Sequence, residues 1–160
     1  CNEALQSLKE KYDLVINVQG DEPIINPKII DDIINKFQLE NNEILSVAKP
    51  ITDLDLIDDI NIVKVEFNSN MLAERFYRKS NNADITSAFK HYGIYAFKPN
   101  ILNEICSLPP TDNELNYKLE QLRWLDNNYK IRIIKTNYSS VSIDNKKDIE
   151  FLLQNFSNEL

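Results

Sequence analysis

The chain has 160 residues, of which 42% are hydrophobic and 27% are charged, and its formal net charge at pH 7 is −7. This length and composition are typical of one soluble globular domain that buries a core of its own. The acidic balance argues against nucleic acid as a partner, because phosphate binding needs clustered Lys and Arg side chains. No apolar run approaches the roughly 20 residues that span a bilayer, so we expect no membrane partner.

The two cysteines, Cys1 and Cys106, form neither a disulfide framework nor a CxxC metal-binding spacing, which favours a reducing, cytoplasmic location. The chain begins with Cys1 and not with Met. We expect a piece that starts inside a longer protein; a cleaved lipoprotein, which also begins with Cys, is the alternative. Residues 1–11 resemble the last turns of an amphipathic helix with Leu5 and Leu8 directed inward.

After this helix, hydrophobic periodicity predicts strands at residues 12–18, 44–51, 61–68, 93–97 and 130–136. Helices are predicted at 26–41, with Pro27 just inside the start, at 114–127 and at 144–156. An acidic connection at 52–59, an element of undecided type at 71–78 and a turn at Pro99 complete the pattern. Alternating strands and helices indicate an α/β class with a largely parallel sheet, and the middle section, which lacks clear helices, indicates a mixed one. No linker divides the chain, so residues 1–160 are predicted to form a single domain.

Glycine is rare in this chain, with only two residues, Gly20 and Gly93. Glycine normally occupies positions that need a positive φ or a close approach of another group. A chain with so few glycines is expected to keep them where no other residue fits. Both positions are therefore predicted to be functional.

The strand that contains residues 15–18 ends in an acidic turn with Asp21 and Glu22. In an open α/β sheet, ligands bind beyond the carboxyl ends of the strands. A carboxylate at such a point can hold Mg²⁺ together with substrate phosphates. Asp144, which follows an apolar segment and precedes a helix, can supply a second carboxylate. Either aspartate can equally be a turn residue or a helix N-cap.

Three further groups of residues are candidates for ligand binding. His91 is the only histidine, and it can bind a carboxylate or a hydroxyl group or have a purely structural role. Glu120 and Gln121 lie on a predicted helix whose leucines face the core, where charged residues usually form a solvated face. An acidic sugar can be bound by the cluster of Arg75, Arg78 and Lys79, which can also be ordinary surface charge. No glycine-rich phosphate loop or nucleophile–histidine motif is present.

Five segments, in this order along the chain, resemble the 3-deoxy-manno-octulosonate cytidylyltransferase (CMP-Kdo synthetase) family. They are Val15-Ile16-Asn17-Val18-Gln19-Gly20-Asp21-Glu22-Pro23, Asn61-Ile62-Val63-Lys64-Val65, His91-Tyr92-Gly93-Ile94-Tyr95, Leu119-Glu120-Gln121-Leu122-Arg123, and Ser142-Ile143-Asp144 with Asp148-Ile149-Glu150. Together they cover nearly the whole chain, which makes their order far more specific than any one segment. Both glycines lie inside them.

The resemblance implies a nucleotide-diphospho-sugar transferase-like, Rossmann-like fold with helices on both faces of the sheet. It also implies an enzyme of lipopolysaccharide precursor synthesis, a cytoplasmic homodimer that depends on Mg²⁺. Such an enzyme joins CMP from CTP to Kdo, an eight-carbon acidic sugar, and releases pyrophosphate. The partners it implies are therefore CTP and Kdo.

The resemblance also implies roles for individual residues. Asp21 and Asp144 would be the catalytic metal ligands. Arg78 would meet the sugar carboxylate, because Phe76-Tyr77-Arg78 is similar to the family's Phe-Ser-Arg; Arg75 is the alternative. The other implied substrate-binding residues are Gln19, Gly20, Glu22, Pro23, His91, Tyr95, Glu120 and Gln121.

Two departures from the family pattern leave alternatives open. The first third of the family, whose Pro-Ala-Arg…Arg-Leu-Pro-Gly-Lys loop holds the CTP phosphates, is absent, so residues 1–160 alone are expected to be inactive. The segment 79–86 lacks the expected Ile-Pro. The alternatives are a cytidylyltransferase for a related acid sugar, sialic-acid-like or amino-substituted, and a non-catalytic remnant that binds a sugar or a partner.

Overall fold

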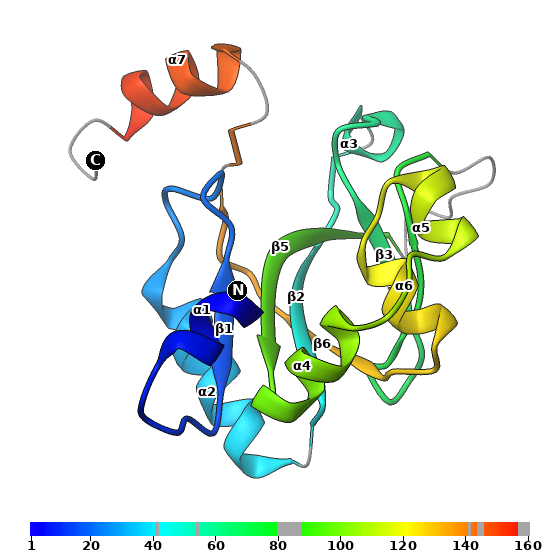
Figure 1. The fold of residues 1–160 in the computed structure, drawn as a ribbon. Coiled ribbons are helices and arrows are strands. Elements are labelled where there is room, and N and C mark those ends of the chain that lie inside the picture. Colours follow the sequence, from blue (N-terminus) through cyan, green and yellow to red (C-terminus); the bar gives the residue numbers. More distant parts are fainter. Residues whose placement is uncertain (41, 54, 80–87, 141, 144–145, 157–160) are drawn as a thin grey trace.

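A computed structural model describes the chain except for residues 41, 54, 80–87, 141, 144–145 and 157–160, and the described part has a sheet with helices on both faces (Figure 1). The strands are β1 (Val15–Val18), β2 (Ile44–Pro50), β3 (Lys64–Phe67), β4 (Ala73–Tyr77), β5 (Phe89–Phe97) and β6 (Ile131–Lys135). The helices are α1 (Asn2–Ser7), α2 (Pro27–Leu39), α3 (Asp55–Asp58), α4 (Pro99–Cys106), α5 (Asp112–Tyr117), α6 (Gln121–Asp126) and α7 (Lys146–Asn155).

The sheet has the strand order β4-β3-β5-β2-β6, and β1 also pairs with β5. The predicted α/β class with a mixed sheet is confirmed. The expected largely parallel arrangement holds for strand direction, because β1, β2, β3 and β6 all run the same way. It does not hold for pairing: β5 runs against β1, β2 and β3, and in the described part only β2 and β6 pair in parallel.

One edge of β5 is shared by two strands. β2 pairs along the whole of the opposite edge, whereas β3 pairs with Phe89–Lys90 and β1 pairs with Ile94–Phe97. The His91 amide still donates to the Val63 carbonyl (2.8 Å), so the unpaired interval between β3 and β1 falls at Tyr92–Gly93. This split opens the sheet at one point along its central strand.

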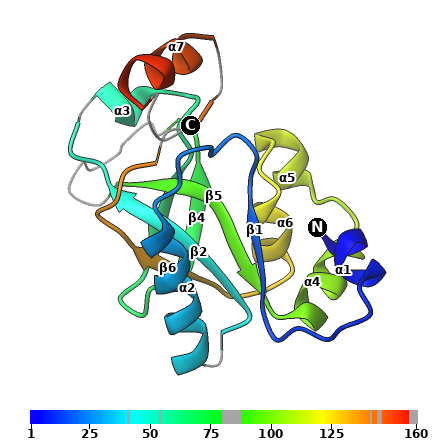
Figure 2. The same ribbon diagram turned by 90° about the vertical axis from the view of Figure 1, so that its left-hand side faces the viewer.

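The two faces of the sheet are covered by different helices (Figure 2). On one face, Ile29 and Ile33 of α2 pack against Leu45, Val47 and Ile94. Helix α2 starts as the sequence predicts, with Pro27 in its first turn and the side chain of Asn26 accepting a hydrogen bond from the Lys28 amide (3.0 Å). The other face is covered by α4, α5 and α6, and its core includes Ile101, Leu102, Ile105, Leu119, Leu122 and Trp124.

The single helix predicted at 114–127 is wrong, because the chain breaks between α5 and α6. Lys118 has φ 54° and ψ 48°, a left-handed conformation that ends α5. In one continuous helix, Leu115 and Leu119 would share a face. In the structure Leu119 is buried, whereas Leu115 is 62% exposed. Burial of Leu119 and Trp124 in the core thus overrides local helix propensity.

The break is held by an ion pair between the two helices. The Arg123 Nε donates to Glu114 Oε2 (2.6 Å), its Nη2 pairs with Glu114 Oε1, and its Nη1 donates to the Leu108 carbonyl (3.2 Å). The two side chains are only 17% and 13% exposed. A bidentate contact of this kind fixes the orientation of the two side chains as well as their distance. It therefore fixes the orientation of α6 relative to α5.

The ends of other elements also differ from prediction. Pro99 begins helix α4 and not a turn, because its fixed φ suits a first helical residue. Helix α1 ends at Ser7, and Leu5 packs against the core as expected, whereas Leu8 is 52% exposed. None of the helices that the structure describes combines the length and apolar character needed to cross a membrane.

We expect Arg123→Leu to lower the free energy of unfolding by about 2 kcal/mol, because it leaves the Glu114 carboxylate without its partner in a mostly buried place. Denaturant unfolding of the chain measures this. Lys36→Met is the matched control, since its pair with Glu40 is more exposed, at 38% and 36%. Equal losses in the two variants would contradict the role given to the Arg123 pair.

Candidate active site

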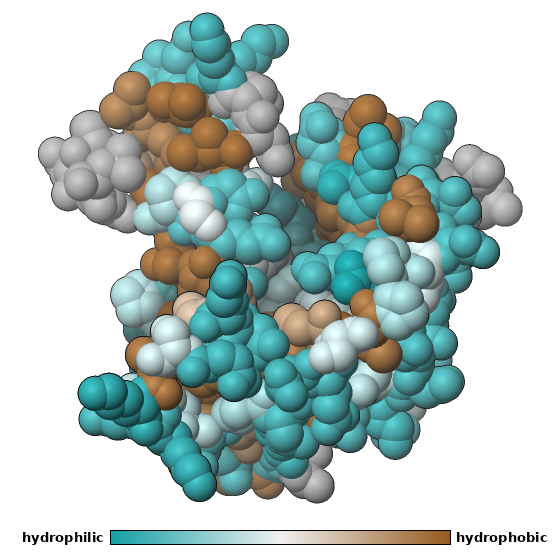
Figure 3. All heavy atoms as spheres, viewed as in Figure 1, coloured by the Kyte–Doolittle hydropathy of each residue, from teal (hydrophilic) through white to brown (hydrophobic). Residues whose placement is uncertain are grey.

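A cavity of about 280 Å³ opens where the edge of β5 is split. Figure 3 shows the face on which the surface is hollowed, with hydrophilic residues gathered around the recess. Its lining comes from the ends of β1, β3 and β4, from β5, from the turn between α5 and α6, and from residue 142. The lining residues are Gln19, Asp21, Glu22, Asn61, Ile62, Val63, Arg78, Lys90, His91, Gly93, Tyr95, Lys118, Leu119, Glu120, Gln121 and Ser142.

Most of the site residues predicted from the sequence meet in this cavity. Gly20 and Pro23 do not line it, and both are exposed. Asp144 lies outside the described residues. Arg78 lines the cavity, whereas Arg75 is 54% exposed and pairs with Glu66.

Gly93 is the position where the chain needs a glycine. A Cβ added there would lie 2.4 Å from Oε1 and 2.8 Å from Cδ of Gln19. The missing side chain therefore lets Gln19 lie across β5 at the cavity. Gly20 has open space around its Cβ position and no left-handed φ, so the conformational need predicted for both glycines is found only at Gly93.

Glu22 anchors the turn after β1. It is buried, and its carboxylate accepts hydrogen bonds from the Ser140 hydroxyl and the Gly93 amide. Burial raises the pKa of Glu22, against the lowering effects of the Ser140 bond and of the Lys90 charge. Beside it, the Ile143 amide donates to the Asp21 carbonyl (2.8 Å). The turn is thus tied both to β5 and to the segment that leads to α7.

Asp21 has an unsatisfied carboxylate oxygen. Its Oδ1 is buried and has no hydrogen-bond partner in the part of the chain that the structure describes. Buried carboxylate oxygens are normally paired, because desolvation without a partner is costly. A cation beside Oδ1 would satisfy it. The described residues hold no group of three or more His, Cys, Asp or Glu that could bind a metal. Mg²⁺ does not need such a group, because it usually binds one or two protein carboxylates and takes its other ligands from water and phosphate.

His91 is a buried, neutral base. Its Nε2 lies 2.7 Å from the Ser46 hydroxyl oxygen, and its ring packs against Phe76 and Tyr95 with centroid distances of 5.1 and 5.3 Å. Burial lowers the pKa of His91 from 6.5 to about 3. The imidazole is therefore uncharged near neutral pH. It is suited to hydrogen bonding with a ligand and too weak a base to take a proton from a hydroxyl.

Tyr95 is held in the cavity wall by α6. Its ring meets Trp124 edge to face, with centroids 4.9 Å apart. Burial, and then the nearby charge of Glu120, raises the pKa of Tyr95 well above its ordinary value. The phenol therefore stays protonated. On the same stretch Gln121 is buried and Glu120 is exposed, so the break before α6 brings an amide and a carboxylate to one wall.

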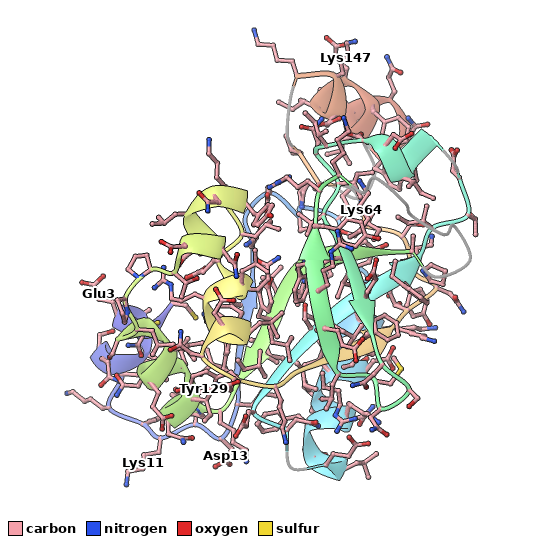
Figure 4. All side chains as sticks on the ribbon, turned by 90° about the vertical axis from the view of Figure 1, so that its right-hand side faces the viewer. Glu3, Lys11, Asp13, Lys64, Tyr129 and Lys147 are labelled. Atoms are coloured by element: carbon pink, nitrogen blue, oxygen red, sulfur yellow. The ribbon has the colours of Figure 1, made fainter. Side chains whose placement is uncertain are left out.

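Lys64 is a site-forming residue that the sequence pattern did not single out. It is fully buried, and its Nζ donates to the carbonyls of Asp59 and Arg78, both at 2.6 Å. The Arg78 Nη1 in turn donates to the carbonyls of Ile60 (3.1 Å) and Asn61 (3.0 Å). Figure 4 shows Lys64 at the end of the sheet formed by β3 and β4. Two cations thus tie the loop before β3 to the end of β4.

The signal that marks Lys64 in the sequence is its place between two valines, in the run Val63-Lys64-Val65 of a predicted strand. A strand interior rarely tolerates a lysine whose ammonium group has no partner. Burial is the main cause that lowers the pKa of Lys64. The backbone carbonyls that accept from it come from residues 5 and 14 positions away, which no local pattern reveals.

The neutral His91 makes stability depend on pH. Its pKa of about 3 lies below the ordinary 6.5, so the unfolded chain binds a proton that the folded chain does not. The stability that the neutral ring contributes is complete above pH 6.5 and is lost as the pH falls toward 3, by up to about 1.4 kcal/mol per pH unit. Denaturant unfolding at a series of pH values measures the slope.

His91→Gln is the control for this slope. It removes the titrating ring and keeps Glu22. The raised pKa of Glu22 changes stability with pH in the opposite direction, and it does so equally in the wild type and in the variant. We expect the variant to lose less stability than the wild type on acidification. Identical slopes would show that the ring is not buried in its neutral form.

Residues 1–133 match the family model described as Cytidylyltransferase. The 3-deoxy-manno-octulosonate cytidylyltransferase of Parabacteroides distasonis is 37% identical over 99% of this chain and 68% of that protein. The protein of that name from Bacteroides thetaiotaomicron is 34% identical over 94% of this chain and 65% of its own length. The mitochondrial protein of that name from Arabidopsis thaliana is 36% identical over 94% of this chain and 54% of its own length.

Solved structures agree with the sequence comparison. The structure of CMP:2-keto-3-deoxy-manno-octonic acid synthetase complexed with CTP superposes with a TM-score of 0.88 at 25% identity, over 99% of this chain and 67% of that one. The 4-diphosphocytidyl-2C-methyl-D-erythritol synthase of Anaerococcus prevotii, with a TM-score of 0.57 at 16% identity over 93% of this chain and 61% of its own, shares the fold alone. The chain thus spans between about half and two thirds of the curated relatives it matches, and it belongs to the 3-deoxy-manno-octulosonate cytidylyltransferase family.

Proposed function

We propose that this protein transfers CMP from CTP to Kdo and releases pyrophosphate, as a step of lipopolysaccharide precursor synthesis. The observation that carries the proposal is the buried Asp21 Oδ1, which has no partner among the described residues, in a cavity that also holds Arg78, His91 and Gln121. Family membership supports it, as does a related structure solved as a complex with CTP. In a non-catalytic remnant, a desolvated carboxylate oxygen without a partner would cost stability and serve no function.

We propose Asp21 and Asp144 as the ligands of Mg²⁺. The hydrogen bond from Ile143 to the Asp21 backbone supports this pairing, since Ile143 directly precedes Asp144 in the chain. When bound, Mg²⁺ would lower the pKa of the attacking hydroxyl and reduce the negative charge that this hydroxyl meets at the α-phosphate.

The reaction needs no covalent intermediate with the protein. The anomeric hydroxyl oxygen of the sugar forms a bond to the α-phosphorus, its proton leaves to solvent water, and the bond from that phosphorus to the bridging oxygen of pyrophosphate breaks. The chain's own residues position the sugar for this attack. Arg78, oriented by two backbone carbonyls, meets the sugar carboxylate. The hydroxyl groups of the sugar are bound by Gln19, His91, Tyr95, Glu120 and Gln121.

The remaining properties are proposed on the same basis. We propose a cytoplasmic homodimer; Cys1 and Cys106 are both free thiols, which suits a reducing compartment. The Arg- and Lys-containing loop that the family resemblance implies for the CTP phosphates is not found in residues 1–160, so we propose that these residues alone are inactive. A related acid sugar is the second candidate substrate, favoured by the departure of segment 79–86, most of which lies outside the described residues.

We expect Asp21→Asn to abolish turnover while the fold stays intact, because it removes a charge at the metal position and keeps the side-chain volume. Pyrophosphate release from CTP and Kdo by the natural protein, with Mg²⁺ present, measures turnover, and thermal unfolding checks the fold. Asp13→Asn is the control, because Asp13 is an exposed acid far from Lys64 and the cavity (Figure 4). Wild-type rates from Asp21→Asn would exclude Asp21 as a metal ligand.

Gly93→Ala should weaken sugar binding, because the added Cβ displaces the side chain of Gln19. We expect the KM for Kdo to rise about tenfold, the loss of roughly one hydrogen bond, with little change in stability since only a flexible side-chain end must move. Gly20→Ala is the matched control, because nothing lies within 4 Å of its added Cβ. Equal effects of the two substitutions would show that the close approach at Gly93 is irrelevant to the sugar.

A further inference from the structure

Behind the cavity, a buried hydroxyl group contacts the only histidine. Ser46 is fully buried in β2 and does not line the cavity. Its Oγ lies 2.7 Å from His91 Nε2 and 2.9 Å from the carbonyl oxygen of Ile94. His91 itself lines the cavity, so Ser46 reaches the site only through the imidazole ring.

The number of protons on Ser46 and His91 decides which group donates and which accepts in these two contacts. A serine hydroxyl has one proton, and a backbone carbonyl can only accept. Both contacts are hydrogen bonds only if the Ser46 proton goes to Ile94 and the ring donates from Nε2 to Oγ. A neutral imidazole carries a single N–H, so Nδ1 is then left with its lone pair.

An irregularity in the sheet brings the three groups together. β2 and β5 change register between Ser46, which pairs with Tyr95, and Val47, which pairs with Tyr92. Gly93 and Ile94 are therefore extra residues on β5, as in a β-bulge. The bulge places the Ile94 carbonyl within reach of Ser46. Phe76 and Tyr95 hold the ring from its sides.

We infer that Ser46 is a positioning residue that fixes His91 as the Nε2–H tautomer, so that the ring presents a hydrogen-bond acceptor, Nδ1, to the cavity. Nε2 points to Ser46, outside the cavity lining, which leaves Nδ1 as the ring nitrogen that faces a ligand. That the ligand is an acidic sugar rests on the proposed function.

This inference decides between the two ligand groups that the sequence left open for His91. A bare nitrogen can accept from a sugar hydroxyl, but it repels a carboxylate or a phosphate. The cavity has other groups for those anions, among them Arg78 and Lys90. His91 therefore selects for a hydroxyl at one position of the sugar. A sugar that lacks this hydroxyl would leave a buried acceptor unpaired, which is strongly disfavoured.

¹⁵N NMR of the chain labelled at histidine tests the tautomer directly. Because His91 is the only histidine of this chain, its ring signals need no residue assignment. The couplings of the two nitrogens to the ring Hδ2 and Hε1 protons tell Nε2 from Nδ1, and protonated and bare nitrogens differ widely in chemical shift. We expect a protonated Nε2 and a bare Nδ1 at neutral pH. A proton on Nδ1, or an averaged pair of signals from both tautomers, would overturn the inference without any variant having to fold.

Ser46→Ala tests the consequence for substrate binding in the natural protein. Without its acceptor, the Nε2 proton is expected to move to Nδ1. We expect the KM for Kdo to rise about tenfold, and the KM for CTP to stay within about twofold. Thr136→Val is the matched control, since Thr136 is another buried hydroxyl of the same sheet region that accepts from the Tyr138 amide. It should change neither the ¹⁵N signals nor the KM for Kdo.

The outcomes separate this inference from the proposed function. An equal rise of KM in both variants, or an unchanged KM for Kdo in Ser46→Ala, would overturn the role of Ser46 in binding. Normal turnover of Kdo together with a proton on Nδ1 would reject the inference and leave the proposed function standing. No turnover of CTP with Kdo by the natural protein would reject the sugar as ligand, even with the Nε2–H tautomer observed.

Discussion

The site depends on how one edge of β5 is divided between two other strands. β3 and the residue before it pair with its first residues and β1 with its last, so the interval at Tyr92–Gly93 stays open to side chains from elsewhere. A strand paired along its full length on both edges would close this space with backbone hydrogen bonds. Because β1 and β3 both run against β5, their ends and the turns attached to them meet at the interval. The cavity is thus a consequence of topology before any side chain is considered.

Buried polar contacts then hold each wall in place. Glu22 accepts from Ser140 and Gly93, Lys64 donates to two carbonyls, and Arg123 bridges α5 and α6. Each of these residues satisfies a desolvated group that would otherwise be costly. In the cavity lining that the structure describes, Asp21 Oδ1 is the buried side-chain atom left without a partner. Because the other buried polar side chains of the cavity walls are paired, this atom supports the proposal of a cation beside Asp21.

Much of this could be predicted from the sequence, and the misses share a physical cause. Local periodicity is sufficient for α2 and for β1, β2, β3 and β6, because the apolar pattern and the helix N-cap depend on neighbouring residues. It leaves residues 71–78, which contain β4, undecided, and it predicts β5 only over 93–97. The break at Lys118 was missed, because it follows from burial of Leu119 and Trp124 against distant strands. Most cavity residues were reached through the ordered family segments. Ser46 could have been noticed as the one polar residue of the apolar run 44–48, but its partners are 45 and 48 positions away.

The five residues His91–Tyr95 serve the site in several ways that constrain one another. Gly93 has no side chain, which admits Gln19 from the β1 side. It also lies in the bulge that gives Ser46 access to Ile94 from the β2 side. Straightening the bulge would shift His91 by two residues along β2 relative to Ser46, because the register changes by two residues at this point. The position of His91 and the access of Gln19 are therefore not independent features. Both follow from two extra residues in the central strand, so we expect a change that removes the bulge to disturb both.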